Sequence, residues 1–307
     1  MIFDTHTDIL YDIVRRHLRK ETQSLQDYHI PQMLEGSVTG GIWTYYTDVN
    51  NKQCETIDEA LVYVFEELSQ TDNIHLVKHQ DDWADHKMNV LLGLEGLATV
   101  RDLNHMKSLY EQGFRHAMLT WNEQNQYATG VAGDNERGLT ELGIKLIKLM
   151  NELGMVVDVS HANEKTFYDI LEVAKGPILA SHSNCYALQP HRRNLKDEQI
   201  KAIAKTDGVI GVTAVPSFTT GNEATIHDLV NHIDHIKNLV GIQHIALGFD
   251  FMNYLSDDKR NANLIDCPSA SSAHQVIDEL MERGYSSYEI DRIVNLNAKR
   301  VINQILK

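Results

Sequence analysis

The order of apolar and polar residues divides the chain into short apolar runs and longer amphipathic segments. Short apolar runs that are bounded by polar residues are typical of strands, and several are apolar at nearly every position. The runs that predict strands are 1–6, 40–47, 89–96, 116–122, 154–161, 177–183, 208–215 and 244–251. Strands that are apolar on both faces predict a parallel sheet covered by helices.

The segments between these runs carry apolar residues at helical spacing. They are 56–71, 140–154, 163–176, 196–208 and 225–241. Thr56, three residues before Glu59, and Thr140 are the predicted N-caps of the first two helices. A glycine at the end of each of the other segments, and Gly154, predict the points at which the helices end. The tail, 287–306, predicts one or two further helices.

Eight strands that alternate with helices over about 250 residues predict a TIM-type (β/α)8 barrel. We expect a single domain over residues 1–307, because no low-complexity stretch or Pro/Gly-rich linker divides the chain. A doubly wound open sheet is the alternative. That fold normally has a glycine-rich phosphate turn after its first strand, and the segment 4–13 (DTHTDILYDI) contains no glycine.

Composition narrows the function classes. The chain is 42% hydrophobic and 23% charged, which is normal for a globular protein with a sizeable core. Its net charge of −15 argues against nucleic acid or an anionic membrane as a partner. Three widely spaced cysteines, Cys54, Cys185 and Cys267, do not suggest disulfides or a cysteine-based zinc site. Without a leader sequence or a long apolar run, we expect a cytoplasmic protein.

Candidate catalytic residues follow the predicted strands. A barrel enzyme carries its active site at the carboxyl ends of its strands. The polar and aromatic residues at those ends are His6, Asp8, Glu95, Trp121, Asn122, His161, His182 and Asp250. Imidazoles and carboxylates without cysteine suit divalent zinc, with manganese, cobalt or iron as alternatives. We therefore predict a metal site at this end of the barrel.

Each of these residues also has an ordinary structural explanation when it is taken alone. His161 suits a core histidine that bonds a carbonyl, and Glu95 suits the first turn of a helix. The whole set on consecutive strand ends favours the metal site. By contrast, His232 and His235 lie on a predicted outer helix, where we expect packing or solvation. The chain contains no G-x-S-x-G, Walker A or H-E-x-x-H motif.

The chain resembles the renal (membrane) dipeptidase family of binuclear zinc peptidases, within the amidohydrolase-like barrel group. The resemblance is carried by ordered motifs: DTHTDI (4–9), GLEG (93–96), GMVVDVSHA (154–162), PILASHSN (177–184), HRRNLKDEQI (191–200), HIALGFDF (244–251) and NLNAKRV (295–301). It implies a (β/α)8 barrel with two zinc ions. His6, Asp8 and the bridging carboxylate of Glu95 would hold one ion, and Glu95, His161 and His182 the other.

The resemblance also implies a reaction, in which a hydroxide bridging the two metals attacks the peptide bond of a dipeptide. Asp250 would transfer the proton, and Arg193 would bind the free C-terminal carboxylate. Trp121 stands where such proteins carry a histidine near the scissile carbonyl, so either the zinc ions alone polarise that carbonyl or Asn122 or Asn125 substitutes. Met252 stands where a second Asp is frequent. Both departures predict an altered pocket.

The expected partners are therefore small dipeptide substrates, with no nucleic acid and no membrane, and a homodimer is an open alternative. Two other functions also remain open. One is a related amidohydrolase that acts on lactam, N-acyl or D-amino-acid amides, which the change at Trp121 would suit. The other is a metal-binding barrel without catalysis.

Overall fold

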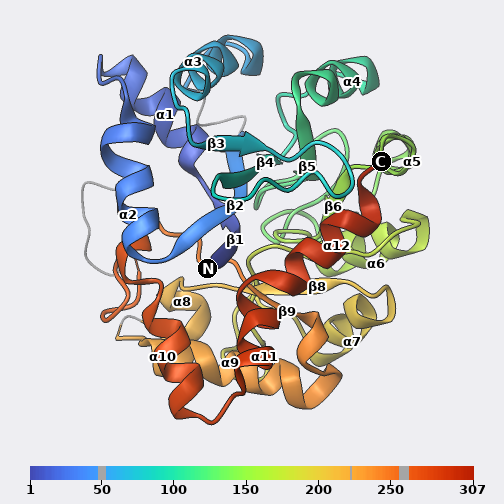
Figure 1. Cartoon of the computed structure of the whole chain (residues 1–307). Helices are drawn as coiled ribbons and strands as arrows, with labels where there is room; N and C mark the ends of the chain where they lie inside the picture. The colour runs from blue at the N-terminus through green and yellow to red at the C-terminus, as the bar shows by residue number, and fades with distance from the viewer. Residues whose placement is uncertain (48–52, 222, 256–262) are drawn as a thin grey trace.

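A parallel sheet that closes into a barrel occupies the centre of the molecule (Figure 1). The computed structural model describes residues 1–47, 53–221, 223–255 and 263–307. The strands in this part of the chain are β1 Ile2–Thr7, β2 Val38–Tyr46, β3 Ile74–Leu76, β4 Met88–Glu95, β5 Phe114–Met118, β6 Val156–Asp158, β7 Leu179–Ala180, β8 Val209–Val212 and β9 Ile245–Leu247.

The ring closes through β1, which pairs in parallel with both β2 and β9. β2 pairs with β4, and the remaining strands follow in chain order from β4 to β9. The eight strands other than β3 thus form a closed parallel barrel, and each overlaps one of the eight predicted runs. β3 was not predicted; its three residues pair only with the beginning of β4.

Helices surround this barrel (Figure 1). The longer ones are α1 Ile9–Leu18, α3 Ile57–Ser69, α4 Leu103–Gln112, α5 Glu141–Leu153, α6 Glu164–Val173, α7 Asp197–Lys205, α9 Ile226–Val240, α10 Gln275–Glu282 and α12 Asn297–Ile305. The shorter ones are α2 Ile30–Glu35, α8 Pro216–Thr219 and α11 Ser287–Asp291. The turns are the π-helical η1 Leu25–His29 and η4 Arg292–Leu296, and the 3-10 turns η2 Ile242–His244 and η3 Ala270–Ser272.

The predicted N-caps are confirmed, whereas two of the predicted helix ends are wrong. The hydroxyl of Thr56 accepts a hydrogen bond from the Glu59 N–H, and that of Thr140 caps α5 in the same way. α5 ends at Gly154, which has a left-handed φ of 73°. However, α6 and α7 end before their terminal glycines. Gly208 instead directly precedes β8, at a position where a Cβ would lie 2.1 Å from the Ile178 carbonyl oxygen.

The C-terminal helix α12 closes one end of the barrel. In Figure 1 it crosses the end of the barrel at which the N-terminus lies. Its buried residues Ala298, Val301 and Ile302 belong to one apolar cluster with Phe3 of β1 and residues from the beginnings of other strands. Burial of this apolar surface explains why the tail packs back onto the barrel, and it leaves the opposite, carboxyl end of the strands for chemistry.

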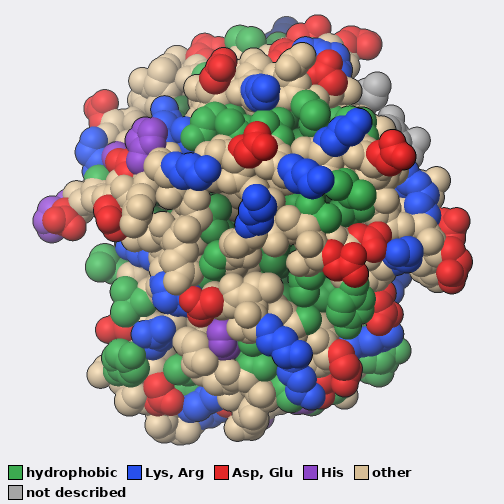
Figure 2. Space-filling model, turned by 90° about the vertical axis from the view of Figure 1, so that its right-hand side faces the viewer, with side chains coloured by type: hydrophobic (Ala, Val, Ile, Leu, Met, Phe, Trp, Pro, Cys, Tyr) green, Lys and Arg blue, Asp and Glu red, His purple; other side chains and the backbone are tan. Residues whose placement is uncertain are grey.

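The surface carries charges of both signs. Figure 2 shows the side of the molecule on which α5, α6 and α7 lie, with Lys and Arg side chains interspersed among Asp, Glu and apolar groups. Within the described ranges, none of the helices combines the length and the apolar character that a membrane span requires.

Candidate metal centre

Six of the predicted site residues meet at the carboxyl end of the barrel. His6 lies in β1 and Asp8 follows it, and Glu95 is the last residue of β4. The other three lie just beyond strand ends: His161 after β6, His182 after β7 and Asp250 after β9. Because all these strands are parallel, their carboxyl ends share one mouth of the barrel. All six side chains are buried or nearly so.

The carboxylate of Glu95 lies between two sets of imidazoles. Its Oε2 is 3.7 Å from His6 Nε2, and its Oε1 is 2.9 Å from His161 Nε2 and 3.7 Å from His182 Nε2. The Nε2 atoms of His161 and His182 are 2.9 Å apart. A tetrahedral ion bound at zinc–nitrogen distances would separate its ligand atoms by about 3.4 Å. The three distances among Glu95 Oε1 and these two nitrogens bracket that value.

Two further carboxylates, those of Asp8 and Asp250, lie beside His6. Its Nε2 is 3.8 Å from Asp8 Oδ1 and 3.8 Å from Asp250 Oδ1. Although His6 is fully buried, neither of its ring nitrogens has a hydrogen-bond partner among the described residues. Buried polar atoms are normally bonded, so the free lone pair of this neutral imidazole is suited to a metal ion at this point. The donor atoms of His6, Glu95 and His182, and those of His6, Asp8 and Asp250, are close enough to share an ion.

The outer edges of these side chains are held by hydrogen bonds. His161 Nδ1 donates to Asn122 Oδ1 at 2.9 Å, so its other nitrogen is left with a free lone pair. His182 Nδ1 is 2.8 Å from the Ser181 hydroxyl. The Thr44 hydroxyl donates to Asp8 Oδ1 at 3.0 Å. Bonds of this kind fix ring orientation and tautomer at metal sites.

The backbone is strained at two of these positions. His161 and Asp250 have left-handed φ values of 68° and 56°, respectively. A residue other than glycine in this region costs about 1–3 kcal/mol, and such strain concentrates at functional sites. In both cases the turn directs the side chain from a strand end into the mouth of the barrel.

Asp158, which sequence reasoning missed, joins the ends of β6 and β7 below the donors. Its Oδ1 accepts hydrogen bonds from the N–H groups of Ser160 at 2.8 Å and Ser181 at 3.1 Å. Its Oδ2 is 2.8 Å from His116 Nε2. The sequence signal was a carboxylate inside an apolar strand run. Gly93 leaves room for the His116 ring, since a Cβ there would lie 2.5 Å from its Nδ1.

Burial controls the charge of the site. It raises the pKa of Glu95 well above its usual value, and the neighbouring charges of Asp8 and Asp250 add to this. Burial and the charge of Asp8 raise the pKa of Asp250 to about 7. Burial also lowers the pKa of His6 to about 4 and those of His161 and His182 well below the usual value. The imidazoles are therefore neutral at pH 7 and have lone pairs to offer.

A cavity of about 300 Å³ opens above the donors. Its polar lining consists of Asp8, Glu95, Asn122, His161 and Asp250. Its apolar lining includes Tyr11, Tyr46, Trp121, Val215, Phe218 and Met252. Trp121 and Asn122 thus reach the cavity, as the sequence predicted, whereas Tyr11, Tyr46 and Phe218 were missed. No strand-end pattern could have found Tyr11 or Phe218, because they come from helices.

Arg193 lies on the other side of His161, in a second cavity of about 180 Å³. Its Nη2 donates to the His182 carbonyl at 3.2 Å, and its Nε has no partner among the described residues. The guanidinium carbon is 5.4 Å from the ring centre of Phe218. Burial lowers the pKa of Arg193 to about 10, so it stays a cation at neutral pH. This cation is available for an anionic group near the donors.

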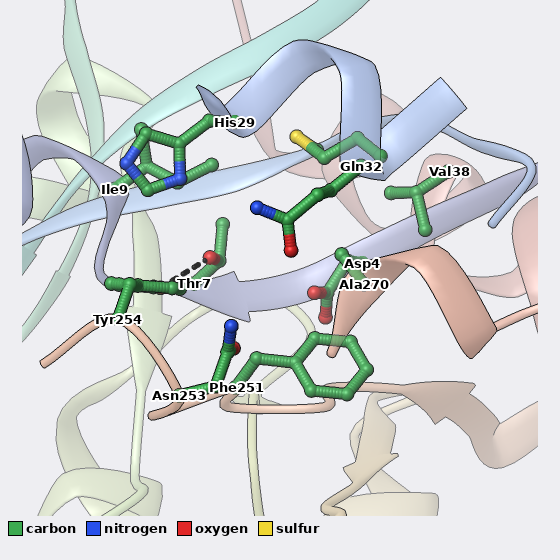
Figure 3. A pocket seen from close by; sticks show the side chains of 11 residues that line it. Asp4, Thr7, Ile9, His29, Gln32, Val38, Phe251, Asn253, Tyr254 and Ala270 are labelled. Atoms are coloured by element: carbon green, nitrogen blue, oxygen red, sulfur yellow. Dashed lines mark hydrogen bonds between the residues drawn. The ribbon is translucent and has the colours of Figure 1, made fainter. Parts of the chain in front are cut away.

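A third cavity, of about 20 Å³, lies beside β1 and has room for about one water molecule (Figure 3). Asp4, Asn253 and Tyr254 are among the residues that line it, and the Tyr254 hydroxyl is 3.0 Å from that of Thr7. Asp4 Oδ1 accepts hydrogen bonds from the N–H groups of Phe249 and His6. This cavity is too small for an organic ligand.

His232 and His235, the two histidines of the outer helix α9, are engaged in packing contacts. His232 is buried, with Nδ1 accepting from the Cys185 N–H at 3.1 Å and Nε2 3.0 Å from the Thr219 carbonyl oxygen. His235 Nε2 instead lies 2.8 Å from Asp197. Cys185 is buried, and burial raises the pKa of its thiol. These residues have structural partners rather than a shared ligand.

A closed parallel barrel with imidazole and carboxylate donors at its carboxyl end belongs to the class of metal-dependent barrel hydrolases. Within that class, residues 1–307 match the family described as membrane dipeptidase (peptidase family M19), and the chain belongs to this family of metallopeptidases. The sequence resemblance is thereby confirmed.

Curated relatives agree with this assignment, and a solved structure has a similar fold. The chain is 27% identical over 332 residues to the dipeptidase verJ of Clonostachys rogersoniana, covering 99% of this chain and 84% of that protein. It is 27% identical over 298 residues to the dipeptidase aclJ of Aspergillus oryzae, and this match covers 90% of this chain and 69% of that protein. The fold is similar to that of a metallo peptidase from Rhodobacter sphaeroides liganded with a phosphinate mimic of the dipeptide L-Ala-D-Ala, with a TM-score of 0.85, 20% identity and 99% of each chain covered.

Proposed function

We propose that this protein hydrolyses dipeptides that have a free C-terminal carboxylate, using two divalent cations held at the mouth of the barrel. One cation would be bound by His6, Asp8 and Glu95, and the other by Glu95, His161 and His182. The observation that carries the proposal is the position of Glu95, whose two oxygens face His6 on one side and the pair His161 and His182 on the other.

Zinc is the proposed metal, because imidazole and carboxylate donors at tetrahedral spacing suit it. Two divalent cations bound here would lower the pKa of a shared water molecule towards neutrality and polarise the substrate carbonyl. The fixed tautomer of His161 and the unpaired nitrogens of His6 support this assignment. Burial raises the pKa of Glu95, and a cation bound beside it would favour the ionised carboxylate.

Asp250 is the proposed proton carrier. Its carboxylate lines the large cavity 3.8 Å from His6 Nε2, and neither of the proposed ligand sets includes it. A carboxylate in this position would accept a proton from the attacking water and pass it to the leaving amine. The left-handed backbone at Asp250 supports a functional role, since the surrounding structure must compensate the strain.

Arg193 is the proposed anchor for the substrate's C-terminal carboxylate. The buried guanidinium has an unpartnered Nε and lies close to His182, through its bond to that residue's carbonyl. Arg binds carboxylates with paired hydrogen bonds, which Lys cannot match. Such an anchor explains a preference for dipeptides, because a longer chain would place an uncharged amide where the carboxylate belongs. The name dipeptidase of the two fungal relatives agrees with this substrate class.

The test combines a metal assay with a substrate panel. We expect about two metal ions per chain and metal-dependent hydrolysis of dipeptides but not of dipeptide amides, which lack the carboxylate. Glu95→Ala and His161→Ala should lose metal and activity together, whereas Asp250→Asn should keep the metal and lose turnover. Arg193→Ala should mainly raise KM for substrates with a free carboxylate.

Three outcomes would contradict the proposal or a part of it. Equal rates on dipeptides and their amides would instead favour the broader amidohydrolase function, which the presence of Trp121 in the cavity suits. A protein that binds no divalent metal would point to a barrel without this chemistry. Full activity of Asp250→Asn would remove Asp250 from its assigned role.

A further inference from the structure

One wall of the large cavity is built from aromatic rings. The ring of Trp121, just beyond β5, meets that of Tyr46, at the end of β2, edge to face at a centroid distance of 5.1 Å. Tyr46 in turn meets Tyr11 of α1 edge to face at 5.4 Å. Edge-to-face pairs of this kind hold each ring in place. We call Trp121, Tyr46 and Tyr11 the aromatic wall.

The rest of the upper cavity is also apolar. Val215, Phe218, Met252 and Leu255 complete its lining, from the segments that follow β8 and β9. Met252 is 37% exposed, so part of this apolar surface faces solvent. The polar lining residues lie at the metal centre, apart from Asn122, which bonds a ligand imidazole. A group that enters the upper cavity therefore meets mainly aromatic and aliphatic surface.

The position of the two cavities decides which part of a substrate meets this wall, and this step rests on the proposed function. His161 lines both cavities, with Arg193 in one and the aromatic wall in the other. A dipeptide whose carboxylate is bound by Arg193, and whose peptide bond lies over the donors, extends its N-terminal residue into the large cavity. The ammonium group then lies beside Asp8 and Asp250, and the N-terminal side chain lies against the rings.

We infer that the aromatic wall, with Trp121 at the end that meets His161, makes the site selective for dipeptides with a large apolar N-terminal side chain. Trp121 also lies near the reacting centre, with its ring centre 5.8 Å from that of His161. Burial of a Leu or Phe side chain against such a surface, compared with Ala, changes binding by about 10- to 100-fold. An anionic N-terminal side chain loses hydration there without gaining an opposite charge, since Arg193 lines the other cavity.

The experiment compares kcat/KM for Leu-Gly, Phe-Gly, Ala-Gly and Asp-Gly with that for the reversed dipeptides Gly-Leu and Gly-Phe. We expect the wild-type ratio of Leu-Gly to Ala-Gly to be about 10 to 100. Trp121→Ala should reduce this ratio to below about 5, because it removes the largest ring of the wall. Trp121→Phe should retain most of it. Trp83→Phe, which alters a ring that packs on Phe3 at the other end of the barrel, is the matched control and should keep the wild-type ratio.

A ratio near 1 in the wild type, or an unchanged ratio in Trp121→Ala, would overturn the inference. Calorimetric titration of the metal-loaded Asp250→Asn protein with the same dipeptides tests it without turnover. We expect Leu-Gly to bind at least about tenfold more tightly than Ala-Gly, and equal dissociation constants would also overturn it. Hydrolysis of dipeptides without this preference contradicts the aromatic wall alone. Absence of any metal-dependent hydrolysis contradicts the proposed function, and the titration then still decides on the wall.

Discussion

Replacement of Asp158 tests whether one buried carboxylate organises two strands of the candidate metal centre. Asp158 is almost fully buried, and its oxygens accept from the N–H groups of Ser160 and Ser181 and interact with His116. Burial opposes its ionisation, but the hydrogen bond and charge of His116 and the bonds from Ser181 and Ser160 keep its pKa below the usual value. The carboxylate is therefore ionised in the folded protein at neutral pH.

The expected loss of stability follows from those three contacts. Asp158→Ala leaves two buried N–H groups without an acceptor, each at a cost of about 1–3 kcal/mol. It also removes the partner of His116, and breaking a buried pair costs about 3–5 kcal/mol in all. Asp158→Asn keeps an oxygen for Ser160 and Ser181 and offers an N–H to His116, so we expect a loss of only about 1–2 kcal/mol.

Metal affinity should change as well, because Ser160 and Ser181 directly precede two donor histidines. Ser160 Oγ accepts from the N–H of His182, and Ser181 Oγ contacts the ring of the same residue. Loss of such supporting contacts typically weakens metal binding by about 10- to 100-fold. Urea unfolding of the metal-free protein gives the stability, and competition with a chromophoric chelator gives the metal affinity. Asp72→Ala, at the surface, is the control.

The reasoning would be refuted if the free energy of unfolding of Asp158→Ala lay within about 0.5 kcal/mol of the wild-type value, a difference typical of surface substitutions. A lower stability with unchanged metal affinity would leave Asp158 a purely structural residue. Only a joint loss, smaller in Asp158→Asn than in Asp158→Ala, supports its role in positioning the histidines.

Three further predictions concern stability. Burial raises the pKa of Asp4 to about 8, above its unfolded value of about 3.9, so wild-type stability relative to Asp4→Asn should fall from about pH 4 to 8 and then level off. A constant difference in urea unfolding of the metal-free proteins would contradict this. The buried carboxylate of Glu67 accepts hydrogen bonds from the N–H groups of Ser24 and Leu25. Glu67→Gln should therefore lower the free energy of unfolding by about 2 kcal/mol, and an unchanged urea midpoint would contradict this. Finally, a chelator should lower the Tm of the wild type by differential scanning fluorimetry but leave Glu95→Ala unchanged, and an equal shift in both would argue against the centre.

The sequence predicted the barrel because its strands are buried on both faces and therefore stand out as apolar runs. The lengths of the strands from β5 onwards were overestimated, as for 177–183, where only Leu179–Ala180 pair as a strand. The residues beyond the paired segment turn towards the barrel mouth, and apolar content does not distinguish these residues from the strand itself. β3 was missed because three half-buried residues are too few to form a recognisable run.

The donors of the site were predictable for a related reason. His6, Glu95 and His182 are polar residues within or next to apolar strands, and parallel strands bring their ends together without further information. Tyr11 and Phe218 could not be found in this way, because they enter the cavity from α1 and α8, whose docking depends on packing across the whole fold. Asn122 was expected to bind the substrate, and its hydrogen bond to His161 could be found only in the structure.

The arrangement of charge explains how such a site would orient its substrate. The carboxylates of Asp8, Glu95 and Asp250 lie in the large cavity, and the cation of Arg193 lies in the other. A dipeptide carboxylate is attracted to Arg193, and its ammonium is attracted to Asp250, the carboxylate that neither proposed metal-ligand set uses. Because the protein as a whole has a net charge of −15, long-range attraction does not concentrate anionic substrates at its surface. Orientation must then arise inside the site, where burial strengthens each of these interactions.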